Sequence, residues 1–189
     1  MKDQNLFAAV VVVLIIPGML FSLIPNSNND LLQPTQITEP NLEIQQRDTS
    51  VRIKTEEGVI SMELEEYVAG VLGGEMPADF DMEALKAQSV AIRTYTLKKL
   101  NGSKHTDADI CTDPTCCQAF SANVDELIKS AVATTQGQVL TYGEELIDAT
   151  YFSCSGGKTE DAAAVWGADV PYLQSQVSPG EEIAAHYVD

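Results

Sequence analysis

Basic residues are scarce in this sequence. The chain of 189 residues contains 11 Lys and Arg against 28 Asp and Glu, and its net charge is −17. Proteins bind nucleic acids through surfaces rich in Lys and Arg, because these side chains displace the counterions of the phosphates. The composition therefore argues against nucleic acid as a partner and against adsorption to an anionic membrane surface. A neutral polysaccharide is compatible with it.

Charged residues are absent from a long run near the N-terminus. No charge occurs from Leu6 to Ile24, and the run is close in length to the roughly 20 apolar residues that span a bilayer. Pro17 and Gly18 interrupt it, which a membrane helix tolerates. The run is longer than the apolar core of a signal peptide, and no A-x-A-like cleavage site follows it. We predict a retained transmembrane helix in residues 1–25, with a cleaved signal peptide as the alternative.

The residues after this predicted helix are polar and punctuated by proline. Residues 26–48 show no periodic pattern, which indicates a flexible linker between the membrane and a folded domain. Lys2 is the basic residue beside the apolar run and gives weak support to a cytoplasmic N-terminus. We therefore expect a protein that crosses the cell membrane once, with everything after Pro25 outside the cytoplasm.

Periodic patterns begin after the linker. Apolar and polar residues alternate over residues 51–54 and 59–62, which indicates a short β-hairpin. Apolar residues at helical spacing follow, and we expect Gly73-Gly74 to end this helix. The residues predicted on its inward face are Leu64, Tyr67, Val68, Val71 and Leu72.

The remaining patterns predict two more helices and two strands. The helices cover residues 81–100 and 125–135, the strands cover residues 139–142 and 146–153, and residues 105–122 are expected to form a loop. The order of a hairpin, then helices, then strands indicates one α+β domain over residues 49–189, with about three helices and short strands. The last twenty residues lack a clear element, so we expect the domain to be incomplete at the C-terminus.

One acidic residue stands apart because of its place in this pattern. Glu75 lies where the first helix is predicted to end, between Gly73-Gly74 and Met76-Pro77. The negative end of a helix macrodipole disfavours an ionised carboxylate, and a carboxyl group that keeps its proton at neutral pH can act as a general acid. Judged by residue type alone, Glu75 is one of 28 acidic residues, and a solvated loop glutamate is the ordinary alternative.

Three motifs resemble those of the SpoIID family, the stage II sporulation protein D/LytB domain. They are the E-M-P element at Glu75, the helix E-A-L-K-A-Q-S-V-A-I-R-T-Y over residues 83–95, and Y-F-S-C-S-G-G-K-T-E over residues 151–160 with V-W-G-A-D-V-P-Y-L-Q-S over residues 165–175. They occur in the expected order and cover most of the domain, from about residue 51 to residue 178.

This resemblance implies a peptidoglycan lytic transglycosylase with Glu75 as its catalytic residue. Such an enzyme works in engulfment during sporulation, at the mother-cell membrane that faces the forespore, alongside stage II sporulation proteins P and M. One carboxyl group suffices, because the C6 hydroxyl of the muramic residue is the nucleophile and no second carboxylate is needed. We interpret Asp79, Asp81 and Glu83 as a helix cap and first-turn acids. LytB-type relatives imply the alternative, a non-catalytic peptidoglycan-binding module that enhances a separate wall amidase.

The same motifs supply candidate substrate-binding residues. They are Gln88, Arg93, Ser153, Ser155, Gly156 and Tyr172. A glycine-rich turn allows a sugar chain to approach backbone N–H groups closely, although a tight turn of purely structural purpose has the same composition. Tyr172 is equally consistent with stacking on a sugar ring and with filling the core. No G-x-S-x-G element is present to make either serine a nucleophile.

Three cysteines and a histidine crowd one loop. His105, Cys111, Cys116 and Cys117 together offer four donors that suit a tetrahedral zinc ion, and relatives of clostridial type carry a similar cluster. A disulfide between Cys111 and one of the adjacent cysteines is the alternative outside the cytoplasm. A zinc ion here is expected to be structural and is not required for the chemistry, and nothing in the sequence places it beside Glu75. We expect Cys154 to be a buried free thiol.

Overall fold

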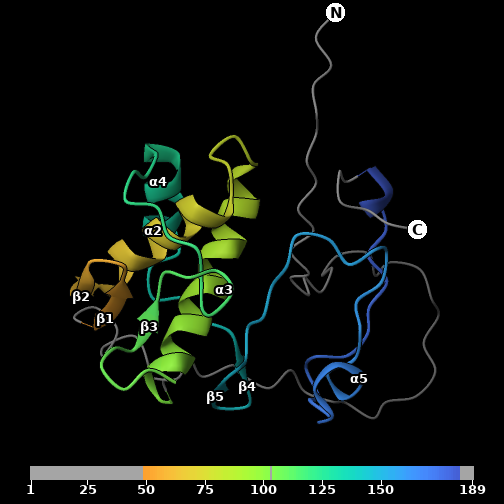
Figure 1. Cartoon of the computed structure of the whole chain (residues 1–189). Helices are drawn as coiled ribbons and strands as arrows, with labels where there is room; N and C mark the ends of the chain where they lie inside the picture. The colour runs from red at the N-terminus through yellow and green to blue at the C-terminus, as the bar shows by residue number, and fades with distance from the viewer. Residues whose placement is uncertain (1–48, 103, 184–189) are drawn as a thin grey trace, which may run out of the picture.

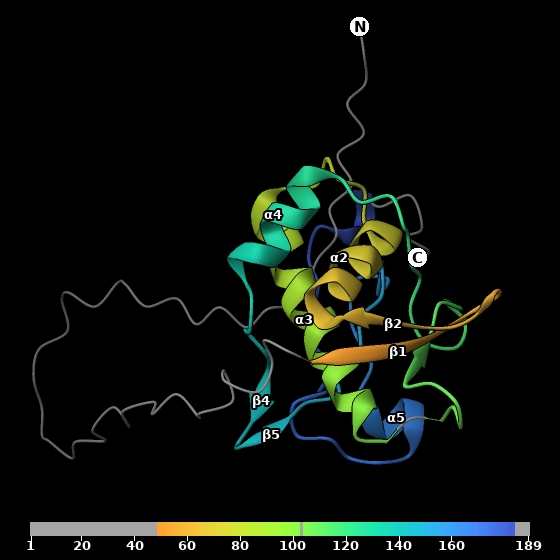
Figure 2. The same ribbon diagram turned by 90° about the vertical axis from the view of Figure 1, so that its left-hand side faces the viewer.

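The computed structural model describes residues 49–102 and 104–183 (Figures 1 and 2). The predicted transmembrane helix and linker lie outside these residues. In the described part of the chain, no helix is long and apolar enough to cross a membrane.

The domain begins with the predicted β-hairpin. Strands β1 (Ser50–Thr55) and β2 (Gly58–Glu63) pair antiparallel from Ser50 opposite Glu63 to Thr55 opposite Gly58. The side chains of Val51 and Ile53 point into the core, where both are fully buried. The expectation that residues 105–122 form only a loop is wrong, because β3 (Ile110–Cys111) pairs parallel to β1. Two residues are too few to give an alternating pattern, which explains why the sequence did not show this strand.

Helix α2 (Leu64–Glu75) carries the predicted apolar face, and all five inward residues are buried. The prediction that Gly73-Gly74 ends the helix is wrong, because both glycines are helical. A Cβ atom on Gly74 would lie 2.8 Å from the backbone nitrogen of Phe120, so this glycine serves close packing instead. The helix ends where Pro77 forces Met76 into an extended conformation, with φ −131° and ψ 135°.

Two further helices begin and end close to their predicted limits. Helix α3 (Met82–Leu100) is capped by Asp81, whose Oδ1 accepts a hydrogen bond of 2.9 Å from the backbone N–H of Glu83. Helix α4 (Glu126–Thr134) is capped in the same way by Asp125. The three long helices pack on one another and enclose one hydrophobic core with β1 and β3 (Figure 2).

The chain after α4 is much less regular. The predicted strand over residues 146–153 is wrong in extent: β4 (Thr141–Tyr142) and β5 (Glu145–Leu146) form only a minimal hairpin, and no strand within the described residues lies beside residues 147–153 to extend the ladder. A short helix, α5 (Ala162–Trp166), and a 3-10 turn, η1 (Glu181–Ile183), follow.

The described residues therefore divide into two regions of different character, within a mixed α/β fold of the predicted α+β class. We call residues 49–138 the helical body and residues 147–183 the C-terminal segment. The β4–β5 hairpin joins them beside the end of α3, where the Lys98 ammonium donates to the carbonyl of Leu146. Figure 1 shows the C-terminal segment on the side of α3 that faces away from the β1–β2 hairpin.

Candidate active site

The carboxylate of Glu75 is exposed at the C-terminal end of α2. Its Oε1 atom accepts a hydrogen bond of 2.9 Å from the backbone N–H of Ala119. This bond is possible because Gly74 has no side chain and lets the 119–120 backbone approach the helix end. The other oxygen, Oε2, accepts no hydrogen bond from the described residues, so the carboxylate of this exposed residue is held through Oε1.

A second partner of the Glu75 carboxylate comes from the C-terminal segment. The hydroxyl of Tyr151 donates to Oε1 at 3.4 Å and itself accepts a hydrogen bond of 2.9 Å from the side-chain amide of Gln118. Burial raises the pKa of the Tyr151 phenol well above its usual range, and the charge of Glu75 adds to this effect. Tyr151 therefore remains a protonated hydrogen-bond donor at every physiological pH.

Gln118 holds this arrangement from inside the core. The residue is 1% exposed, and its side-chain carbonyl accepts hydrogen bonds from the hydroxyls of Thr96, at 3.1 Å, and Tyr67, at 3.4 Å. Its amide is thereby fixed so that the N–H group points at Tyr151. A chain of hydrogen bonds thus runs from α2 and α3 through Gln118 and Tyr151 to the Glu75 carboxylate.

The predicted His/Cys cluster is brought together by the fold. The ligand atoms of His105, Cys111, Cys116 and Cys117 all lie within 4.8 Å of one another. The Nε2 atom of His105 is 3.4 Å from the sulfur of Cys117 and 3.7 Å from that of Cys116, and these two sulfurs are 3.8 Å apart. Tetrahedral zinc bonds to sulfur at ~2.3 Å and to nitrogen at ~2.0 Å, so its ligands are separated by roughly 3.3–3.8 Å. The four cysteines of the chain are free thiols in the structure, and the donor set fits zinc.

The cluster is connected to Glu75 through the residues that directly follow Cys117. Cys117 directly precedes Gln118, which holds Tyr151, and Ala119, which holds Glu75. A ligand that fixes Cys116 and Cys117 would therefore also fix the backbone that supports the candidate catalytic carboxylate. The sequence alone did not place the cluster beside Glu75, because the separation of 44 residues between Glu75 and Ala119 hid their contact.

Two of the predicted substrate-binding residues lie in the core. Arg93 is completely buried, and its guanidinium binds both carboxylate oxygens of Glu65, at 2.9 and 2.6 Å. It also donates to the carbonyl of Gln138 at 3.1 Å. Gln88 is 4% exposed. Both residues are thus buried, and their contact with a ligand stays a prediction. Arg93 joins α2 to α3 and the end of the helical body.

The glycine-rich turn has a partner that the sequence did not indicate. Ser153 and Gly156 are exposed, whereas the N–H and hydroxyl groups of Ser155 are bound by the carboxylate of Glu181. The half-buried thiol of Cys154 lies near the same carboxylate, at 3.7 Å. The backbone groups of Ser155 that were expected to meet a sugar are therefore occupied by the protein itself.

Tyr172 lies half-buried against the β4–β5 hairpin. Its hydroxyl accepts a hydrogen bond of 3.2 Å from the backbone N–H of Asp148, and its ring centroid is 5.5 Å from that of Tyr142 at an angle of 46°. These contacts fix the ring and leave part of it accessible. The structure therefore keeps Tyr172 as a candidate for a sugar-stacking residue, although none of these contacts connects it to Glu75.

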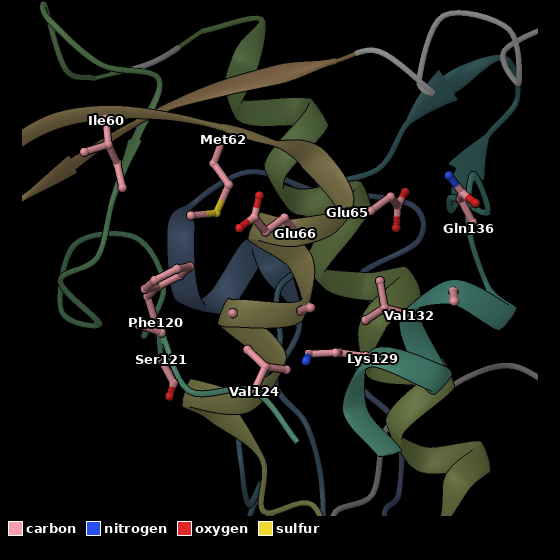
Figure 3. A pocket seen from close by; sticks show the side chains of 14 residues that line it. Ile60, Met62, Glu65, Glu66, Phe120, Ser121, Val124, Lys129, Val132 and Gln136 are labelled. Carbon is pink, nitrogen blue, oxygen red and sulfur yellow. The ribbon is translucent and has the colours of Figure 1, made fainter. Parts of the chain in front are cut away.

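A separate pocket lies between β2, the first two turns of α2 and α4 (Figure 3). It is open, has a volume of about 640 Å³, and is lined mainly by apolar side chains, among them Ile60, Met62 and Phe120. Glu65 and Glu66 add acidic groups from the first turn of α2. Glu75 is not among its lining residues, so this pocket is not part of the candidate active site.

The SpoIID family model, described as stage II sporulation protein, matches residues 53–142. The chain carries a SpoIID-family domain. The stage II sporulation protein D of Bacillus subtilis (strain 168) is 36% identical over 69% of this chain and 43% of that protein. The protein of the same name from Bacillus amyloliquefaciens is 33% identical over 83% of the chain and 50% of that protein.

A relative with a different name matches as well. The amidase enhancer of Bacillus subtilis (strain 168) is 41% identical over 55% of this chain and 14% of that protein. The chain thus spans half or less of the length of these relatives. The matched family region contains Glu75, Gln118 and the His/Cys cluster, whereas Tyr151 lies beyond it.

Proposed function

We propose that this protein is a peptidoglycan lytic transglycosylase of the SpoIID family that works in sporulation. The observation that carries the proposal is the state of the Glu75 carboxylate, which is exposed, is held at Oε1 by Ala119 and Tyr151, and leaves Oε2 open to a ligand. A general acid needs such a fixed but accessible carboxyl group.

The reaction uses this carboxyl group twice. Glu75 gives its proton to the glycosidic oxygen as the bond between C1 of the muramic residue and that oxygen breaks. The resulting carboxylate then removes the proton of the C6 hydroxyl, whose oxygen bonds to C1 and closes a 1,6-anhydro ring. The proton taken from the C6 hydroxyl restores the carboxyl group of Glu75, so the reaction consumes no water. The nucleophile belongs to the sugar that is cleaved, which accounts for much of the rate through proximity.

Tyr151 and Ala119 orient the carboxylate for both transfers. Their hydrogen bonds fix Oε1, so that Oε2 is the atom that gives and takes the proton. Both donors also stabilise the carboxylate that forms after the first proton transfer. Nothing in this scheme requires a second carboxylate, which agrees with the role of Asp81 as a helix cap.

We further propose that zinc occupies the His/Cys cluster as a structural ion. Zinc held by His105, Cys111, Cys116 and Cys117 would have four protein ligands and no open position for substrate. Its contribution would be to fix the loop that ends in Gln118 and Ala119. Elemental analysis of protein purified without chelators should find about one zinc per chain, and the three thiols of Cys111, Cys116 and Cys117 should resist alkylation until it is removed. An absence of zinc, or an intact disulfide in this loop, would exclude the site.

The test of the activity uses glycan strands stripped of their stem peptides. Wild-type chain purified in detergent should produce 1,6-anhydro ends that mass spectrometry detects, and Glu75→Gln should produce at least about a hundredfold fewer. Glu66→Gln is the matched control, because Glu66 is an exposed glutamate on the same helix. Equal product from the wild type and Glu75→Gln would contradict the proposal.

A second candidate function is supported by the amidase enhancer among the relatives. In this alternative the domain binds glycan and stimulates a separate wall amidase without cleaving the strand. Glycan that the wild-type chain binds in a pull-down, with no 1,6-anhydro ends and with faster release of stem peptides by an added amidase, would favour the enhancer. Binding that survives Glu75→Gln while cleavage disappears would favour the enzyme.

The setting of this activity is also a proposal. We infer that residues 1–25 anchor the chain in the mother-cell membrane, that residues 26–48 carry the domain toward the wall, and that stage II sporulation proteins P and M act beside it in engulfment. Protease added to intact sporangia with permeabilised walls should digest the domain if it lies outside the cytoplasm. Full protection would place it in the cytoplasm and exclude a role at the wall.

A further inference from the structure

Glu181 is the most completely bound carboxylate in the C-terminal segment. The residue is 3% exposed. Its Oε2 atom accepts hydrogen bonds from the backbone N–H of Ser155 at 2.8 Å, the hydroxyl of Ser155 at 2.7 Å, and the backbone N–H of Gly157 at 2.8 Å. Its Oε1 atom accepts a fourth, of 3.0 Å, from the hydroxyl of Ser178. A buried charge with this many short bonds is held in one position.

The turn that receives Glu181 is built to bind an anion. Gly156 and Gly157 have φ values of 73° and 94°, which only glycine adopts readily, and the turn directs the N–H groups of Ser155 and Gly157 at one carboxylate oxygen. Burial by itself would raise the pKa of Glu181, but the hydrogen bonds from Ser155, Gly157 and Ser178 lower it to about 2. The carboxylate is therefore ionised whenever the protein is near neutral pH.

Glu181 also closes a long excursion of the chain. The excursion leaves at Lys158, contains α5, and returns at Val177, where Lys158 and Val177 form an antiparallel bridge. The backbone N–H of Ser178 donates to the carbonyl of Gly157 at 2.9 Å, next to the carboxylate. The beginning and the end of the excursion are thus tied together at the Ser155–Gly157 turn.

The turn bound by Glu181 is connected to the candidate active site through Tyr151. The Ser155–Gly157 turn begins four residues after Tyr151, and the hydroxyl of Tyr151 contacts both Gln118 and Glu75. Residues 147–153 form no strand ladder, so their position depends on what holds them at either end. Tyr151 is one such anchor, and the turn bound by Glu181 is the next along the chain.

We propose that Glu181 is a positioning residue for Glu75, which acts through the Ser155–Gly157 turn and the hydroxyl of Tyr151. The proposal deepens the proposed lytic transglycosylase and rests on it for its effect on cleavage. The loss of the Glu181 carboxylate frees the turn, lets Tyr151 move away from Oε1, and leaves the Glu75 carboxyl group less well oriented.

The test compares Glu181→Gln with Glu182→Gln in the full chain. Glu182 is the adjacent, exposed glutamate and has the same change in charge. We expect Glu181→Gln to lower kcat about tenfold with KM changed by less than about twofold, because a small displacement of an orienting group affects turnover more than binding. Glu182→Gln should leave both unchanged. In ¹⁵N NMR spectra, the side-chain amide of Gln118 should shift in Glu181→Gln and not in Glu182→Gln, since it donates to Tyr151.

Amide hydrogen exchange completes the test. Ser155 and Gly157 should lose protection in Glu181→Gln while the amides of α3 keep theirs. Loss of protection at the turn with an unchanged Gln118 signal and unchanged kcat would overturn the proposal, as would general loss of protection in α3, which would show a role in folding of the whole domain. If the wild type makes no 1,6-anhydro ends, the proposed function fails, yet the Gln118 signal still decides whether Glu181 positions Tyr151.

Discussion

The helical body and the C-terminal segment are stabilised in different ways. The body buries a continuous hydrophobic cluster that extends from Val51 to Val132. The C-terminal segment buries few apolar side chains, and its fully enclosed residues include the polar Ser178 and Glu181. The stabilisation from apolar burial depends on the buried area and tolerates small shifts of side chains. A buried carboxylate needs each of its hydrogen-bond donors in place. The candidate active site takes one contact from each region, at Ala119 and Tyr151.

This difference predicts where stability resides. Ile92→Ala, at a fully buried position of α3, should lower the free energy of unfolding by about 2–5 kcal/mol, because it removes methyl groups and leaves a cavity. Ile183→Ala is the matched control in the C-terminal segment, where the side chain is 61% exposed, and should change stability by less than about 0.5 kcal/mol. Urea unfolding measures both. Equal effects would show that the two regions share one core.

The buried ion pair of the body provides the next largest effect. Glu65→Gln leaves the guanidinium of Arg93 without its charge partner in the core and should cost about 2–3 kcal/mol of stability. Glu66→Gln serves as the control, because Glu66 is the neighbouring residue and is exposed. Urea unfolding measures the structural role of the Glu65–Arg93 ion pair, and glycan binding measured in parallel tests the predicted role of Arg93 in substrate binding. A loss of glycan binding at full stability would support substrate binding by Arg93.

Tyr151 tests the contact between the two regions. Tyr151→Phe removes the hydroxyl that meets Gln118 and Glu75, and should reduce cleavage about tenfold and stability by about 1 kcal/mol. Tyr142→Phe, at an exposed ring of the β4–β5 hairpin, should change neither. Initial rates of 1,6-anhydro product formation and urea unfolding provide the two readouts. Unchanged cleavage in Tyr151→Phe would remove the C-terminal segment from the account of the active site.

Acid should loosen the C-terminal segment before it affects the body. The pKa of Glu181 is lowered to about 2, so its ionised form stabilises the fold above its usual value of 4.5, and this contribution is lost as the pH falls from 4.5 to about 2. Trp166 is the single tryptophan and lies in α5, inside the excursion that Glu181 closes. Its fluorescence anisotropy should decrease over this range while far-UV circular dichroism of the helices is retained. The Glu181→Gln variant should lack this step, and a step that persists in the variant would show that Glu181 is not its source.

The two regions also differ in how much of their fold could be predicted from the sequence. In the body, apolar residues at helical spacing and capping residues such as Asp81 and Asp125 locate α2, α3 and α4. Gly73-Gly74 misled because both glycines are helical, and the small size of Gly74 serves packing against Phe120, a contact that local sequence does not contain. In the C-terminal segment, α5 is too short to show periodicity. Only the glycine that ends this helix, Gly167 with φ 75°, offered a local signal in the sequence.

The candidate site was predictable only in part. Glu75 stood out because its place at a helix end and its E-M-P element are local, and His105 and the three cysteines stood out because they share one loop. The partners of Glu75 lie 44 and 76 residues away, at Ala119 and Tyr151, and pairings at such distances leave no periodic trace. Glu181 was missed for the same reason, since its partners are 24 and 26 residues earlier.

Cleavage carried out in ¹⁸O-labelled water distinguishes the proposed ring closure at C6 from hydrolysis. The reaction scheme uses the C6 hydroxyl in place of water, so products of the wild-type chain should carry 1,6-anhydro ends without ¹⁸O, and Glu75→Gln should give almost none of them. Reducing ends that contain ¹⁸O would show hydrolysis by a water molecule, and 1,6-anhydro ends formed at the wild-type rate by Glu75→Gln would show that another group carries the proton.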